Sequence, residues 1–182
     1  MSRANPDCSC VLCAPPAREF GDAWVHQLLQ EIRTKGWAVV GVAEDSQFPG
    51  WAYTIGLTHT YGVDELAMFG LDVDDMQHWV GTLGAAIADG RDLLEEGSID
   101  QALLGLPVIL RPMDSSWFEA LFGAAENFYQ GGGPRVRQVV WGDRSGRFPW
   151  DDGVVEESRR GQPAGWLPAS EASSLWAVLL AE

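Results

Sequence analysis

The stretch that decides the fold is Trp51-Ala52-Tyr53-Thr54-Ile55-Gly56-Leu57, whose aromatic and β-branched residues are typical of a β-strand. A turn-rich segment at residues 44–50 separates it from an apolar run at residues 37–42, which predicts a hairpin with a long loop. On the other side, polar residues 58–64 lead to a further strand at residues 65–71. We therefore expect three consecutive strands that form an antiparallel meander.

Outside this meander, hydrophobic residues recur at helical spacing. Apolar residues at helical spacing within residues 20–32, 76–87, 117–128 and 175–180 predict four helices, and further strands are expected at residues 107–110 and 135–141. Asp72 and Asp114 stand where two of the helices need N-caps. The elements predict an α+β fold with a mixed, largely antiparallel sheet of about five strands and helices packed on one face. The order of the later strands stays open, because strand-helix-strand segments also permit parallel pairing.

The length of 182 residues suits one domain with one core. Residues 1–17 form a Cys- and Pro-containing arm, and residues 18–182 are expected to form a single α+β domain. All three cysteines lie within the first 13 residues, so they provide no disulfide framework for the core.

Charge and hydropathy exclude several classes of partner. The formal net charge of −14 repels phosphate backbones and anionic membrane surfaces. No apolar run approaches the roughly 20 residues that span a bilayer, and the N-terminus lacks the apolar stretch of a signal peptide. We expect a cytoplasmic protein that binds neither nucleic acid nor membrane. Signatures of the common hydrolases, metalloproteases and nucleotide-binding proteins are absent from the sequence.

Four motifs follow one another along the chain: Gly-Trp at residues 36–37, Tyr-Thr-Ile-Gly-Leu at 53–57, Glu-Leu at 65–66 and Trp-Gly-Asp-Arg-Ser-Gly-Arg-Phe-Pro-Trp at 141–150. In this order they resemble a bacterial domain-of-unknown-function family, DUF4262. The family-like core covers about residues 36–151, and family members often begin with a Cys-x-x-Cys arm. The family often has Gly-His-Pro-Glu-Leu where this chain has Val63 and Asp64, so any role of that histidine is lost or moved here. The resemblance implies a common fold and a common pocket, but no reaction.

His59 is the first candidate for chemistry, because it lies between two threonines after the central strand. Imidazole has an ordinary pKa near 7, so His59 is a candidate general base that Glu65 would orient. Tyr53, Thr54 and Thr60 would line the same ligand-binding pocket. The alternative is a solvated histidine in a polar loop.

A second candidate stretch runs from Trp141 to Asp151. Trp141 and Trp150 would stack on the faces of a planar ligand, with Arg147 as its anion contact and Asp143 as a further polar group. The structural alternative is a turn in which Asp143 accepts backbone hydrogen bonds and Arg147 pairs with Asp151.

The favoured function is small-molecule binding, in a pocket between the His59 loop and the Trp141–Asp151 segment. An accessory enzyme of metabolism is one form that such a domain takes. The alternative is a regulatory or interaction protein that binds a cationic protein partner through its acidic surface. A redox role for the cysteine arm is a third hypothesis, and it requires a thiol of low pKa.

The cysteine arm also has the composition of a metal site. Cys10 and Cys13 have the spacing that lets two thiolates bind one tetrahedral ion, Cys8 adds a third, and His26 follows Cys13 with twelve residues between them. The cofactor stays unassigned, with zinc as the candidate metal, because the second histidine of a zinc finger is missing and a closed site needs four ligands. A disordered tail is the competing interpretation.

Overall fold

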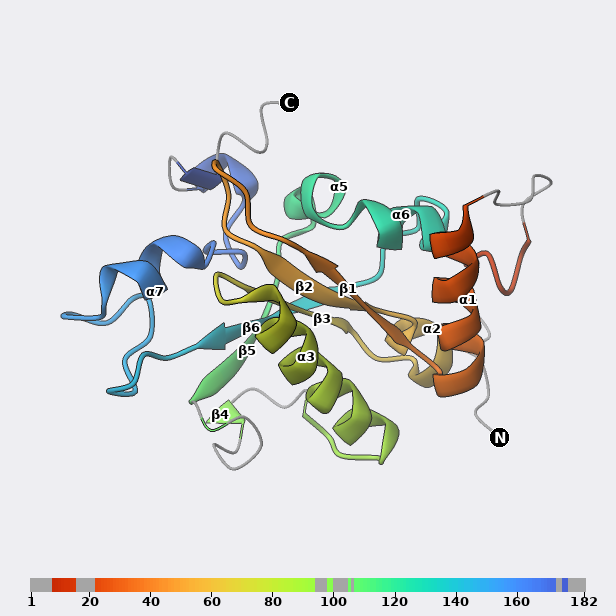
Figure 1. The fold of residues 1–182 in the computed structure, drawn as a ribbon, viewed down its shortest axis with the longest axis horizontal. Helices are drawn as coiled ribbons and strands as arrows, with labels where there is room; N and C mark the ends of the chain where they lie inside the picture. The colour runs from red at the N-terminus through yellow and green to blue at the C-terminus, as the bar shows by residue number, and fades with distance from the viewer. Residues whose placement is uncertain are drawn as a thin grey trace.

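A computed structural model describes residues 8–15, 22–93, 98–99, 105, 107–172 and 175–176. Its centre is a six-stranded sheet with the order β1-β2-β3-β6-β5-β4 (Figure 1). The strands are β1 (Ala38–Val42), β2 (Trp51–Ile55), β3 (Glu65–Phe69), β4 (Ser98–Ile99), β5 (Val108–Pro112) and β6 (Val136–Trp141). Most of the helix expected at residues 175–180, residues 1–7 and 16–17 of the arm, and residues 20 and 21 of the first expected helix lie outside the described residues. Within the described ranges, no helix is both long and apolar enough to cross a membrane.

The first three strands pair as the sequence predicts. β1 pairs antiparallel with β2, and β2 pairs antiparallel with β3, which confirms the meander. β3 then pairs in parallel with β6, and β6 pairs antiparallel with β5. The mixed, mostly antiparallel sheet and the α+β class are therefore confirmed. Because β3 and β6 run in the same direction, the chain that enters β3 and the chain that leaves β6 lie at opposite ends of the sheet.

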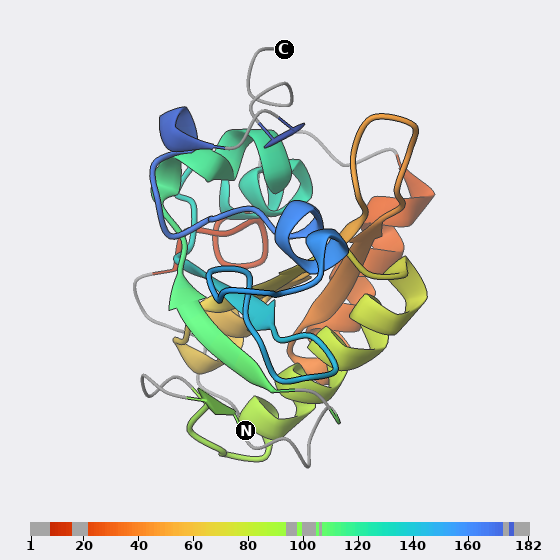
Figure 2. The same cartoon turned by 90° about the vertical axis from the view of Figure 1, so that its left-hand side faces the viewer.

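Helices cover both faces of the sheet, whereas the sequence analysis expected one covered face (Figures 1 and 2). α3 (Val73–Ala88) buries Met76, Val80 and Leu83 against one face. On the other face pack α1 (Ala23–Lys35), α5 (Phe118–Leu121) and α6 (Gly123–Tyr129).

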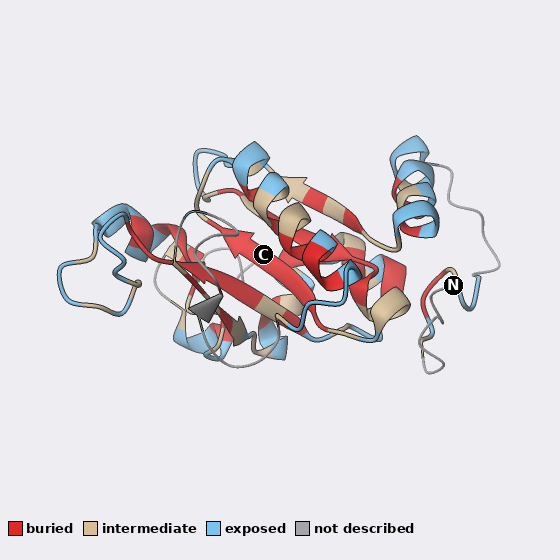
Figure 3. Ribbon diagram, turned by 90° about the horizontal axis from the view of Figure 1, so that it is seen from below, coloured by how far each residue is buried: buried red, intermediate tan, exposed pale blue. Residues whose placement is uncertain are grey.

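The strand β3 shows why both faces need cover. All five of its residues are buried, and side chains of a strand alternate between the two faces (Figure 3). Leu66 and Met68 join the cluster under α3, whereas Ala67 and Phe69 join the cluster on the opposite face. An uninterrupted apolar run of this kind is typical of a strand buried on both sides.

The remaining helices are short. The segment expected as one helix at residues 117–128 is divided into η1 (Ser115–Trp117), α5 and α6, and the chain later forms α7 (Glu156–Gly161) and η2 (Ala169–Glu171). Both expected N-caps are confirmed, because a side-chain oxygen of Asp72 accepts from the backbone of α3 and one of Asp114 accepts from the backbone of η1.

The segment expected as a polar loop after β2 begins with a helical turn, α2 (Leu57–Tyr61). Gly56 precedes it with φ 111°, and a Cβ atom there would lie 2.9 Å from the carbonyl oxygen of Gly36. The absence of a side chain at Gly56 therefore allows the backbone to pass close to the end of α1. Thr60 Oγ1 donates a 2.5 Å hydrogen bond to the same carbonyl oxygen. These contacts place α2, which carries His59, beside the end of α1.

Candidate metal centre

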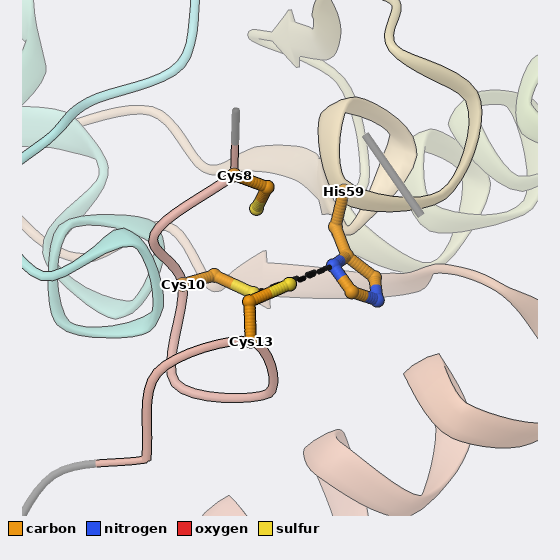
Figure 4. Close-up of side chains that lie close together, drawn as sticks. All are labelled: Cys8, Cys10, Cys13 and His59. Carbon is orange, nitrogen blue, oxygen red and sulfur yellow. Dashed lines mark hydrogen bonds between the residues drawn. The ribbon is translucent and has the colours of Figure 1, made fainter. Parts of the chain in front are cut away.

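The cysteine arm lies against the C-terminal end of α6. The backbone N–H of Val11 donates a 2.9 Å hydrogen bond to the carbonyl oxygen of Phe128, and both Cys10 and Val11 are buried. Within the arm, the N–H of Cys13 donates to the carbonyl oxygen of Cys10 at 2.9 Å, which closes a tight turn. This turn directs the sulfur atoms of Cys10 and Cys13 toward the same point (Figure 4).

His59 faces these sulfur atoms from α2 (Figure 4). Its Nδ1 atom lies 3.4 Å from Cys10 Sγ and 3.4 Å from Cys13 Sγ. With Cys8 included, the four ligand atoms all lie within 4.8 Å of one another. Bonds of about 2.0–2.3 Å to a tetrahedral zinc ion would set its ligand atoms roughly 3.5 Å apart, so the four groups need only small movements to share one ion.

The structure brings together the three cysteines that the sequence singles out, but with a different histidine. His59, expected as a general base, occupies the place expected for His26. The Nδ1 atom of His26 lies 3.0 Å from the carbonyl oxygen of Asp22, on the exposed surface of α1. Among the described residues, the metal-ligand grouping contains Cys8, Cys10, Cys13 and His59, and His26 is not part of it.

Burial shifts the pKa values of three members of this cluster, Cys10, Cys13 and His59. It raises the pKa of the Cys10 thiol to about 12, although the backbone N–H groups of Leu12 and Cys13 near the sulfur act in the opposite direction. Burial also raises the pKa of Cys13 and lowers the pKa of His59, because an apolar environment disfavours charged forms. A neutral imidazole suits metal binding. A reactive thiol needs a lowered pKa, whereas burial raises the pKa of Cys10 and Cys13.

Glu65 holds α2 in place, and its contacts are not those of a group that orients His59. Its carboxylate is buried in β3, where Oε1 accepts 3.0 Å hydrogen bonds from the backbone N–H groups of Gly56 and Thr58. Oε2 accepts a 2.6 Å hydrogen bond from the Thr54 hydroxyl. Gly56 has no side chain that could cap α2, so the carboxylate satisfies N–H groups that the helix leaves free.

Tyr129 of α6 completes the network around this carboxylate. Its hydroxyl donates a 2.5 Å hydrogen bond to Glu65 Oε1 and accepts one of 3.1 Å from the backbone N–H of Gly56. Burial, followed by the negative charge of Glu65, raises the pKa of Tyr129 well above its ordinary value. α6 is therefore tied both to the cysteine arm and to the turn that carries His59.

The other residues expected to line a pocket near His59 have structural contacts. Tyr53 is buried in the core, with its ring edge-on to Phe122 at a centroid distance of 5.1 Å. Thr54 belongs to the Glu65 network, and Thr60 bonds to the carbonyl oxygen of Gly36. Tyr53, Thr54 and Thr60 therefore have structural contacts, and His59 is surrounded by packed side chains and by the cysteine arm.

The Trp141–Asp151 segment forms the turn that was the structural alternative. Asp143 Oδ1 accepts hydrogen bonds of 2.8 and 3.0 Å from the backbone N–H groups of Ser145 and Arg147. The hydrogen bond from Arg147 has the largest effect on the pKa of Asp143, and both bonds lower it. Arg147 Nε lies 3.6 Å from Asp143 Oδ2, so the expected Arg147–Asp151 pair is replaced by an Arg147–Asp143 pair. Asp151 Oδ2 instead accepts from the backbone N–H of Phe148 at 2.8 Å.

The two tryptophans of this segment have different environments. Trp141 is buried, and its Nε1 donates a 2.8 Å hydrogen bond to the carbonyl oxygen of Phe69. Trp150 is 44 % exposed, and its ring stacks on that of Phe148 with a centroid distance of 5.1 Å. The guanidinium of Arg111 lies 4.9 Å from the centre of the Trp150 ring and 4.4 Å from that of Trp166. Sequence reasoning missed this cation–π arrangement, because Arg111 comes from β5 and Trp166 from the chain after α7.

The expected pocket between the His59 loop and the Trp141–Asp151 segment is not formed. Glu65 pairs with Val136 at the start of the parallel β3–β6 ladder, and the His59 turn precedes that point. The Trp141–Asp151 segment follows the other end of β6, about 20 Å further along for a six-residue strand. Figure 1 shows α2 and the chain after β6 at opposite ends of the strands.

A cleft lies elsewhere, between β6 and the helices that follow β5. Its volume is about 320 Å³, and its walls include Phe118, Phe122, Ser115 and Arg135. The residues that the sequence analysis proposed as pocket lining do not contribute to it.

Comparison with known proteins identifies the family. The profile of DUF4262, described as a domain of unknown function, matches residues 31–155, which is more than half of the chain. The match includes His59, Glu65 and the Trp141–Asp151 segment, whereas the cysteine arm precedes it. No curated protein and no solved structure matches the chain. The order of motifs and the family profile agree, and the chain belongs to the DUF4262 family.

Proposed function

We propose that this protein binds one zinc ion through the Sγ atoms of Cys8, Cys10 and Cys13 and the Nδ1 atom of His59. The observation that carries the proposal is the approach of these four ligand atoms to within 4.8 Å of one another. The cysteines come from the N-terminal arm and the histidine from α2, so their convergence is a product of the tertiary fold.

The donor set favours zinc over other biological metals. Three thiolates and one imidazole are soft to borderline ligands, which suit zinc and disfavour magnesium or calcium. Four protein ligands complete a tetrahedron and leave no open position for water or substrate. The proposed role is therefore structural, with the ion fastening the arm to α2.

Measuring zinc content tests this function. Purified without chelator, the protein should contain about one zinc ion per chain, and cobalt substitution should give the absorption spectrum of a tetrahedral site with three thiolates. His59→Gln should lose most of the bound metal. His26→Gln is the matched control, since it changes a histidine outside the cluster, and it should retain the full content.

Two results would contradict zinc binding at this site. If wild type and His59→Gln carry the same substoichiometric metal, or if His26→Gln loses metal as His59→Gln does, the Cys3His site is not the zinc site of this protein.

A second candidate function, small-molecule binding, is favoured by the cleft of about 320 Å³. That volume falls in the range of ligand pockets. The rings of Phe118 and Phe122 offer an apolar wall. Arg135, whose Nε lies 3.0 Å from Asp64 Oδ1, offers a cation at the rim. Together they suit a planar ligand with an anionic group.

Aromatic carboxylates and flavins are the probes for this second function. Titration followed by tryptophan fluorescence should detect binding in the wild type and weaker binding in Arg135→Ala, with Arg144→Ala as a control for loss of a cation. Equal affinity in both variants would place any ligand elsewhere. The alternative of a cationic protein partner depends on the net charge of −14 and stays a prediction.

A further inference from the structure

Gln130, the residue after α6, contacts the cysteine arm at two points. Its side-chain amide nitrogen donates hydrogen bonds of 2.8 Å to the carbonyl oxygen of Ser9 and of 2.8 Å to that of Ala14. These two carbonyl groups flank the segment that contains Cys10 and Cys13. One amide group thus closes the loop of the arm by holding both of its ends.

The backbone of Gln130 is unusual as well. Its φ is 55°, and it is the single non-glycine residue with positive φ among the residues that the structure describes. Helices commonly end in this left-handed conformation. Glycine is the usual residue there, because a side chain raises the free energy of the left-handed backbone. A glutamine at this position therefore suggests that the side chain supplies something that glycine cannot.

The same end of α6 also contacts the part of the chain that supplies the histidine. The ring of Phe128 lies edge-on to His59 at a centroid distance of 6.3 Å, and the hydroxyl of Tyr129 donates to Glu65, which caps α2. Residues 128–130 thus contact the cysteine arm as well as His59 and the residue that caps α2. All of these contacts are between protein groups and need no metal.

We propose that Gln130 is a positioning residue that docks the cysteine arm on α6 in the absence of metal, so that the three thiols stay beside His59 when the site is empty. The docking itself is independent of zinc. Its consequence rests on the proposed zinc function: zinc binds ligands that the docked arm already holds beside His59, and the ion adds to the attachment of the arm.

Alkylation of the metal-free protein tests the docking directly. Cys10 is fully buried when the arm is docked, so its reaction with iodoacetamide, followed by peptide mass spectrometry in excess chelator, reports arm release. Cys10 should react far more slowly in the wild-type protein than in urea-unfolded protein. Gln130→Glu keeps the length of the side chain but removes both donors, and it should accelerate the reaction about tenfold, as expected for two lost hydrogen bonds.

A control separates this effect from the added charge. Gln47→Glu makes the same chemical change at an exposed position between β1 and β2 and should leave the Cys10 rate unchanged. The new carboxylate of Gln130→Glu would itself raise the pKa of nearby thiols and slow alkylation, so an acceleration has to come from release of the arm.

The results distinguish failure of this inference from failure of the zinc function. If metal-free wild type alkylates Cys10 as fast as unfolded protein, or if Gln130→Glu reacts at the wild-type rate, the proposed role of Gln130 is refuted, whatever the zinc content. If the docking holds, Gln130→Glu should also bind zinc about 10-fold more weakly, in the range for residues that support metal ligands. An unchanged zinc affinity in a variant that releases its arm would refute the coupling of docking to the metal site.

Discussion

The carboxylate of Glu65 lies 3.0 Å from the backbone nitrogen of Thr58, the residue before His59. Glu65 belongs to β3 and Thr58 to α2, so a buried strand residue caps the helical turn that carries the proposed metal ligand. A capping group normally comes from the residue that precedes the helix, and here that residue is glycine. The position of His59 therefore depends on a charge that is not part of the cluster itself.

Removing that charge should destabilise the protein strongly. Glu65→Gln keeps the shape but replaces an oxygen that accepts hydrogen bonds with an amide that donates them. The free energy of unfolding should fall by about 2–3 kcal/mol, as expected when buried charge-assisted hydrogen bonds are lost. Urea unfolding monitored by circular dichroism measures this change. Glu157→Gln, at an exposed position of α7, should change stability by less than about 0.5 kcal/mol. Similar values for both variants would argue against the capping role.

The two glycines at the ends of α2 should differ in their tolerance of alanine. Gly56 has φ 111°, and its Cβ atom would meet the Gly36 carbonyl oxygen at 2.9 Å, whereas Gly62 has φ 70° and open space around it. Gly62→Ala should cost about 1 kcal/mol for the left-handed backbone alone. Gly56→Ala adds the clash and should cost at least about 2 kcal/mol more. Thermal unfolding ranks the two variants, and an equal loss would contradict the close packing of α2 on α1.

Alkaline unfolding should depend on Tyr53. Burial raises the pKa of Tyr53 to about 12 in the folded protein, against an ordinary value of about 10 in the unfolded chain. Below pH 10 both states are neutral, and between pH 10 and 12 the unfolded state ionises first, so folding stability falls by about 1.4 kcal/mol per pH unit. Tyr53→Phe lacks this loss. Its stability deficit relative to wild type at pH 8 should therefore shrink or reverse by pH 12 in urea titrations. A deficit that stays constant over this interval would show that Tyr53 does not control the alkaline limit.

Zinc should stabilise the wild type and not a variant without the central thiols. At a free zinc concentration 100 times the dissociation constant, the free energy of unfolding should rise by about 2.7 kcal/mol over the chelated protein. The double variant Cys10→Ser, Cys13→Ser should show no zinc-dependent increment. The increment is the informative quantity, because serine at the buried position 10 also changes the stability of the metal-free state. Zinc-dependent stabilisation that survives in the double variant would place the ion elsewhere.

Local sequence patterns were sufficient for most of the secondary structure. The aromatic and β-branched residues from Trp51 onward predicted β2 and its antiparallel neighbours, and the short polar side chains of Asp72 and Asp114 predicted two helix starts. The Cys-x-x-Cys spacing of Cys10 and Cys13 predicted two thiols at one point. These features depend on residues close together in the chain, where backbone conformation and spacing limit the outcomes.

The long-range arrangement was decided by the tertiary structure. The sequence could select His59 as a chemically notable residue but not pair it with Cys10, because the two are 49 positions apart and meet only when α6 docks the arm beside α2. Likewise, the aromatic detail near His59 and near Trp150 suggested one pocket, but the parallel pairing of β3 with β6 puts these segments at opposite ends of the sheet. Strand order and arm docking result from the burial of apolar surface shared by distant segments, a free energy that no single stretch of sequence contains.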